Sequence, residues 1–178
     1  MRESTDPTVL TTERLILRPQ DPADAVVFRQ LWLERDLRVP EHRRIDRDGR
    51  PTEADILRHI LEMRGEGRTD LLTVVLRDTG KVIGYCGLVY DGHGDAAEPE
   101  LAFELLRTVH GRGYATEAGR AVIASAAEKG RPRLWATVWD WNLASRHVLE
   151  KLGFVETGEV TKESEHGRSL LTVRDPAS

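Results

Sequence analysis

The spacing of apolar positions along this chain changes several times, and each change marks an expected element. Residues 10–18 alternate between apolar and polar side chains, which predicts a first strand. Two apolar runs at residues 71–76 and 82–90 flank a turn at residues 78–81, so we expect a hairpin there. Residues 98–107 alternate again, which gives three consecutive antiparallel strands.

Helical spacing separates these strands and follows them, because apolar positions recur three and four residues apart. In the first expected helix this spacing puts Val26 and Leu31 on the apolar face, and in the second it puts Ile60 and Leu61 there. Glycine ends the later helices. The four expected helices begin at Asp21-Pro22, Thr52-Glu53, Tyr114 and Asn142.

The last part of the chain predicts a crossover. Residues 134–138 form a strand after the third helix, and a strand–helix–strand unit joins parallel strands. Residues 154–155 and 170–173 finish the sheet. The polar residues 38–50 break the pattern, and we interpret them as a solvated connector, with a mobile substrate loop as the alternative.

Composition narrows the class of protein. The chain has 178 residues, of which 39% are hydrophobic, which suits one domain spanning residues 1–178. Its formal net charge of −4 argues against a general nucleic-acid binder. No stretch reaches the ~20 apolar residues that cross a bilayer, and the first residues lack the apolar run of a signal peptide. We therefore expect a cytoplasmic protein without membrane contact.

Cysteine and histidine usage argues against thiol or metal chemistry. The single cysteine, Cys86, sits in an apolar run and is interpreted as a buried structural thiol. The six histidines show no paired ligand spacing, so no metal site is predicted.

Residues 109–118 contain the strongest candidate for a binding site. Gly111 and Gly113 precede a run of good helix formers, so the stretch is interpreted as a loop that opens a helix. Unpaired main-chain amides at a helix start attract anions, and a pyrophosphate suits such a site. The alternative, a glycine-rich turn without a ligand, stays open from these residues alone.

Three passages together resemble the GNAT superfamily of acyl-CoA-dependent N-acetyltransferases, and within it the RimJ/RimL-like group that acetylates ribosomal-protein N-termini. The passages are Thr12-Glu13-Arg14-Leu15-Ile16-Leu17-Arg18, His110-Gly111-Arg112-Gly113-Tyr114-Ala115-Thr116-Glu117-Ala118 with the strand before it, and Asn142-Leu143-Ala144-Ser145-Arg146-His147-Val148-Leu149-Glu150-Lys151-Leu152-Gly153-Phe154. Their order covers nearly the whole chain. His110 departs from the usual arginine or glutamine.

The resemblance implies an α/β (α+β) GNAT fold: a mixed, mostly antiparallel, V-splayed sheet of six to seven strands with about four helices. It also implies acetyl-CoA as co-substrate, with its pantetheine arm between the two middle strands. The residues implied to bind it are Leu105, Leu106, Arg107, Gly111, Arg112, Gly113, Tyr114, Ala115, Thr116, Asn142 and Ser145.

The resemblance also implies which residues transfer protons during the reaction. Glu100 matches the strand position where several family members carry a general base, and alternation places Glu104 on the same side of that strand. We favour Glu100. The tyrosine that often acts as acid is replaced by Leu149, while Ser145 matches the serine proposed in the RimL-like group to protonate the thiolate. A binding or helix-capping role for Ser145 is equally consistent.

The acceptor is an amine, either a protein N-terminus or a small molecule, and the sequence does not name it. Trp135, Trp139 and Trp141 could wall the acceptor site, although we expect core positions for them. The resemblance makes a homodimer plausible. Two rival functions stay open, a non-catalytic acyl-CoA-binding regulator and a nucleotide-binding module built on the glycine loop.

Overall fold

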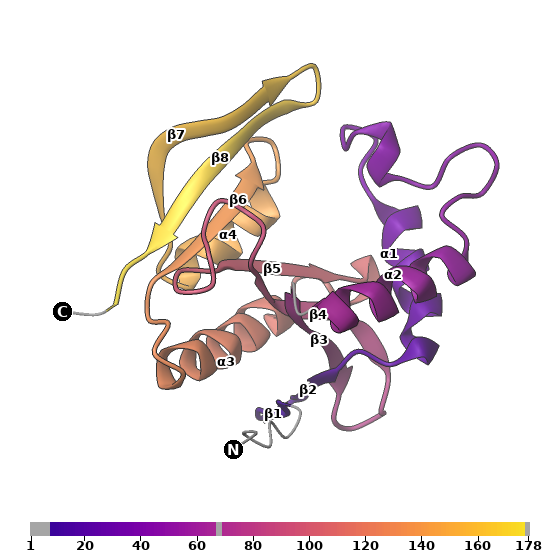
Figure 1. The fold of residues 1–178 in the computed structure, drawn as a ribbon, viewed down its shortest axis with the longest axis horizontal. Coiled ribbons are helices and arrows are strands. Elements are labelled where there is room, and N and C mark those ends of the chain that lie inside the picture. The colour runs from indigo at the N-terminus through magenta and orange to yellow at the C-terminus, as the bar shows by residue number, and fades with distance from the viewer. Residues whose placement is uncertain (1–7, 67–68, 177–178) are drawn as a thin grey trace.

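One eight-stranded sheet organises the part of the chain that the computed structural model describes, residues 8–66 and 69–176 (Figure 1). Its strand order is β1-β2-β3-β4-β5-β6-β8-β7. The strands are β1 (Leu10–Thr11), β2 (Leu15–Pro19), β3 (Thr69–Leu76), β4 (Val82–Val89), β5 (Glu100–Leu105), β6 (Leu134–Trp139), β7 (Val155–Ser164) and β8 (Gly167–Arg174). The helices are α1 (Ala25–Glu34), α2 (Glu53–Glu66), α3 (Tyr114–Glu128) and α4 (Leu143–Lys151), with short 3-10 turns η1 (Pro22–Asp24), η2 (Glu41–Arg43) and η3 (Arg107–Val109). The predicted mixed α/β class with four helices is confirmed.

The sheet has one strand more than the prediction of six to seven, because the expected first strand is broken in two. The Thr12 amide donates to the Leu15 carbonyl at 2.9 Å and makes a tight turn between β1 and β2. Within β2 the expected alternation holds, since Leu15 and Leu17 have no exposed surface. The expectation about a signal peptide concerns residues 1–7, which lie outside the described part.

The first two helices are confirmed, but their apolar faces were predicted only in part. Val26 is 56% exposed, whereas Phe28, absent from the predicted face, is buried. The buried positions of α1 are Ala25, Phe28 and Leu31, which recur every three residues, and Val26 falls outside that spacing. In α2, Ile60 is buried as expected and Leu61 is half exposed.

Helices cover both faces of the central strands. Helix α3 packs on β2, β4 and β5, and α1 packs on β4, where most residues are buried. Helix α4 lies against α3 and β6. Gly119 allows this approach, because a Cβ there would stand 2.5 Å from the Leu152 Cδ1 atom.

The sheet divides into two wings between β5 and β6. These strands are parallel, as the crossover through α3 requires, but their register contains a single pair, Glu100 with Trp135. Beyond that pair β6, β8 and β7 turn away from the first wing, and Figure 1 shows the β7–β8 hairpin standing apart from α1 and α2. The splay is where the candidate site lies. No helix in the described ranges is long and apolar enough to cross a membrane.

Candidate acetyl-transfer site

A cleft of about 1020 Å³ opens where β5 and β6 separate. Its walls come from the end of α1 and the segment after it, from β5 and β6, and from the starts of α3 and α4. Eleven of the residues proposed from the sequence line it: Glu100, Glu104, Leu105, Arg107, Gly111, Gly113, Tyr114, Ala115, Thr116, Asn142 and Ser145. The structure therefore brings together positions that lie up to 45 residues apart in the chain.

Two proposed positions stand outside the lining. Leu106 is buried, and its amide donates to the Ile83 carbonyl at 2.8 Å. Arg112 is exposed, and its carbonyl accepts a hydrogen bond from the Arg14 Nη1 atom at 2.9 Å. In this structure both residues contact other parts of the protein instead of facing the cleft.

The edge of β5 forms the floor of the cleft. The Trp135 amide donates to the Pro99 carbonyl at 3.0 Å, and this is where β6 leaves β5. Leu101 and Phe103 follow on β5 and line the cleft, so this edge faces open space instead of a neighbouring strand. Main-chain donors and acceptors along such an edge need partners, which an extended ligand with amide groups can supply.

Glu100 lies at the closed end of this edge and is 9% exposed. Its Oε1 atom accepts hydrogen bonds from the Thr137 amide at 3.1 Å and from the Thr137 hydroxyl at 2.6 Å. Its Oε2 atom accepts one from the His93 amide at 3.1 Å. The carboxylate thus ties β5 to β6 and to the loop before β5.

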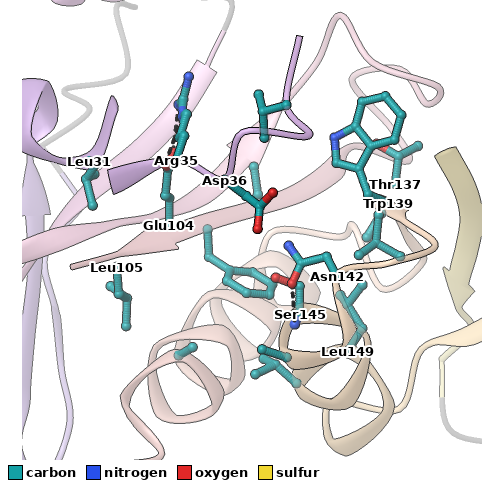
Figure 2. Close-up of a pocket in the computed structure, with 18 of the residues that line it drawn as sticks. Leu31, Arg35, Asp36, Glu104, Leu105, Thr137, Trp139, Asn142, Ser145 and Leu149 are labelled. Carbon is teal, nitrogen blue, oxygen red and sulfur yellow. Dashed lines mark hydrogen bonds and ion pairs between the residues drawn. The ribbon is translucent and has the colours of Figure 1, made fainter. Parts of the chain in front are cut away.

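Glu104 lies at the open end and is held by Arg35 from the turn after α1 (Figure 2). The Arg35 Nε and Nη2 atoms donate to its two oxygens at 2.9 and 2.7 Å, and the Tyr85 hydroxyl donates to Oε2 at 3.0 Å. Burial alone would lower the pKa of Arg35, but Glu104 outweighs it and raises that pKa. Burial, together with the charge of Glu104, raises the pKa of Tyr85. Arg35 therefore stays charged and Tyr85 stays neutral.

The glycine-rich loop has the geometry expected of an anion site. Gly111 and Gly113 have φ angles of +74° and +80°, a region that favours glycine. Gly113 is the N-cap of α3 and supplies no side-chain cap, and the first helical bond runs from the Glu117 amide to the Gly113 carbonyl. The amides before Glu117 have no carbonyl partner within the helix, so they are available to a ligand.

Two side chains fix this loop from either side. Glu117 accepts hydrogen bonds from the Thr12 hydroxyl at 2.6 Å and from the Arg14 Nε atom at 2.7 Å. The His110 Nε2 atom lies 2.8 Å from the Leu105 carbonyl and joins the loop to the end of β5. His110, the departure from the family pattern, therefore contacts the main chain here.

Asn142 and Ser145 open α4 beside the cleft (Figure 2). The N-cap is Asn142, whose Oδ1 atom accepts a hydrogen bond from the Ser145 amide at 3.1 Å. The alternative that Ser145 itself caps the helix is therefore wrong, because it stands at the third helical position. Leu149, one turn further on, is buried at the wall of the cleft.

One wall of the cleft contains Asp36, which sequence reasoning missed, together with residues that it had named. Trp139 and Trp141 line the cleft and stack with ring centroids 6.1 Å apart, so the favoured expectation that they lie in the core is wrong and they form a wall, the alternative that the sequence left open. Asp36 accepts hydrogen bonds from Arg38, which holds the pKa of its carboxyl well below the ordinary range. The Arg38 guanidinium lies 4.2 Å from the Trp141 ring centroid. The segment expected to be a solvated connector is therefore part of the wall.

Trp135 lies elsewhere. The centroid of its ring lies 4.7 Å from that of His93, and its Nε1 atom donates a hydrogen bond to Glu98 at 3.1 Å.

Cys86 is fully buried, as predicted, and burial raises the pKa of its thiol to about 12. Among the described residues no group of three or more histidine, cysteine or acidic side chains could hold a metal ion.

Comparison with known proteins decides the family. The model of the acetyltransferase (GNAT) domain matches residues 14–155. The chain belongs to the GNAT acetyltransferase family. Acetyl-CoA-dependent acetyl transfer is the general reaction of this family, so the protein is an acyltransferase. The predicted family is confirmed.

Individual relatives agree with this assignment. This acetyltransferase is 30% identical over 153 residues to the "Uncharacterized N-acetyltransferase p20" of Bacillus licheniformis, with 84% of this chain and 83% of the relative covered. A GnaT-family acetyltransferase structure from Bordetella pertussis has a TM-score of 0.72 at 26% identity and covers 94% of this chain and 99% of its own. A structure of RimL, a ribosomal L7/L12 alpha-N-protein acetyltransferase, in complex with coenzyme A has a TM-score of 0.76 at 15% identity and covers 95% of this chain and 98% of its own. At that identity, the likeness to RimL shows a shared fold alone.

Proposed function

We propose that this acetyltransferase transfers the acetyl group of acetyl-CoA to a primary amine, on a protein N-terminus or a small molecule. The observation that carries the proposal is the continuity of one cleft. It joins the open edge of β5, the glycine-rich start of α3 and a carboxylate at either end of β5. An extended thiol ester with a diphosphate at its far end matches that sequence of features.

The donor would lie along β5. Its pantetheine amides would bond the main chain of this edge as far as Leu105, and its diphosphate would meet the amides of residues 111–116 at the start of α3. The open space around Gly111, where a Cβ would meet nothing within 4 Å, supports this placement. Arg107, which lines the cleft, would add positive charge near the phosphates.

The chemistry requires a neutral amine and a departing thiolate. The ammonium form of the acceptor loses a proton, the free nitrogen attacks the thioester carbonyl carbon, and the tetrahedral intermediate expels the thiolate of coenzyme A. The thiolate takes up a proton, and the products are the N-acetyl amine and free coenzyme A. The proton on the acceptor nitrogen leaves for a base or for water.

Two carboxylates are the proposed proton acceptors, directly or through water. Glu100 has hydrogen-bond donors on both oxygens, and Glu104 is paired with Arg35. We keep Glu100 as the first candidate from the family match and Glu104 as the second. Ser145 is the proposed proton donor to the thiolate: its side chain lies at the cleft, and its amide, not its hydroxyl, serves the helix cap.

The test measures free coenzyme A thiol released from acetyl-CoA in the presence of an amine panel: short peptides with free N-termini, amino acids and linear polyamines. We expect amine-dependent release for at least one class. Ser145→Ala should lower kcat by about a hundredfold, the lower end of a general-acid contribution, without raising the KM for acetyl-CoA. Binding of acetyl-CoA without thiol release for any amine would favour a non-catalytic regulator. Failure to bind acetyl-CoA would contradict the proposal.

A further inference from the structure

A side chain replaces a main-chain acceptor where β5 and β6 separate. In a parallel ladder, donors follow every second residue, so after the Trp135 amide the next β6 donor toward β5 is the Thr137 amide. A continued ladder would give it the Leu101 carbonyl as acceptor. Instead it donates to the Glu100 Oε1 atom at 3.1 Å, and the Thr137 hydroxyl donates to the same atom at 2.6 Å.

The carboxylate is fixed from its other side as well. The His93 amide donates to Oε2 at 3.1 Å, and a Cβ at Gly92 would stand 2.0 Å from that atom. Three donors thus converge on a side chain that is 9% exposed. Removing such an acceptor leaves each donor without its partner, which costs far more than the net gain of one hydrogen bond.

We infer that Glu100 is a positioning residue that ends the β5–β6 ladder and keeps the edge of β5 open for the pantetheine arm. Without its carboxylate the Thr137 amide would turn to the Leu101 carbonyl, and the ladder would extend by one step into the cleft. The inference rests on the proposed function, because it takes acetyl-CoA as the occupant of that edge. It requires Glu100 to accept hydrogen bonds and is independent of proton transfer during the reaction.

Binding without an acceptor amine therefore reports this role. Calorimetry with acetyl-CoA would compare the wild type with Glu100→Ala, Thr137→Val and Thr137→Ser, and ADP would probe the diphosphate site without a pantetheine arm. We expect Glu100→Ala to weaken acetyl-CoA about tenfold, a free-energy change of about 1.4 kcal/mol, and to leave ADP within about twofold. Thr137→Val should weaken acetyl-CoA about threefold, whereas Thr137→Ser, which keeps the hydroxyl, should match the wild type.

Kinetics separate positioning from proton transfer. With an accepted amine, Thr137→Val should raise the KM for acetyl-CoA by a larger factor than it lowers kcat. Equal acetyl-CoA affinity in the wild type and Glu100→Ala would overturn the inference, and so would a parallel loss of ADP binding, which indicates general unfolding of the site. If Glu100→Ala does not fold, the comparison of Thr137→Val with Thr137→Ser tests the inference. Equal acetyl-CoA affinities of these two variants would contradict it. A wild type that binds ADP but not acetyl-CoA refutes the proposed function first, and this inference with it.

Discussion

The Arg35–Glu104 pair offers the sharpest test of how the cleft is held together. The two charged groups share hydrogen bonds at 2.9 and 2.7 Å, and their side chains are only 12% and 23% exposed. Breaking a fully buried pair costs about 3–5 kcal/mol, and partial exposure reduces this. We expect Glu104→Gln and Arg35→Gln each to lower the free energy of unfolding by about 2–3 kcal/mol, or about 5–10 °C in Tm.

A double-mutant cycle isolates the interaction. Urea unfolding of the wild type, both single variants and the double variant should give a coupling energy of about 2 kcal/mol, because both hydrogen bonds are lost once either partner is changed. Arg58→Gln is the matched control: its pair with Asp55 is exposed, and we expect no measurable change. A coupling energy below about 0.5 kcal/mol would refute the claim that this pair joins α1 to β5.

Three further measurements test other parts of the structure. Asp24, 2% exposed and bonded to Arg18, has a lowered pKa: burial would raise it, but Arg18 and neighbouring donors outweigh burial. Asp24→Asn should therefore lower the free energy of unfolding in urea by about 3 kcal/mol at pH 7. The difference in stability between wild type and variant should shrink as pH falls below 3.8 and through the folded-state pKa of Asp24, and a pH-independent difference would contradict this. Gly113→Ala should lower the free energy of unfolding by about 1–3 kcal/mol and weaken acetyl-CoA binding measured by calorimetry. Gly65→Ala, at an exposed position of α2, should stabilise slightly; equal effects would argue against a strained loop. Trp141→Ala should raise the KM for the amine and leave acetyl-CoA affinity unchanged, and the reverse pattern would place Trp141 on the donor side.

The elements of this fold could be predicted from the sequence because their signals are local. Alternation marked β2, two apolar runs around a turn marked the β3–β4 hairpin, and Gly113 marked the start of α3. The errors were also local in origin. In α1 the apolar residues Val26 and Phe28 lie close together in the sequence, and the buried spacing of Ala25, Phe28 and Leu31 leaves Val26 exposed, so Val26 was assigned to the wrong side.

The contacts inside the site could not be predicted, because they join residues far apart in the chain. Glu100 and Thr137 are separated by 37 residues, and Arg35 and Glu104 by 69. The sequence identified both glutamates through alternation and family likeness, but no local pattern indicates which donor each one meets. Arg38 and Trp141 illustrate the same limit, since their contact depends on how the segment after α1 folds back over the cleft.

Strand β5 emerges as the element that sets the width of the cleft. Glu100 binds it to β6, and Glu104 binds it to the turn after α1, four residues or about 13 Å further along the strand. Two walls of the cleft, β6 and the turn after α1, are thus attached to β5 through a carboxylate, and Arg35 extends the second attachment by donating to the Arg43 carbonyl at 2.7 Å. A carboxylate with such partners holds these elements together whether or not it also transfers a proton. Loss of activity in a glutamate variant therefore identifies a base only when acetyl-CoA affinity and stability are unchanged.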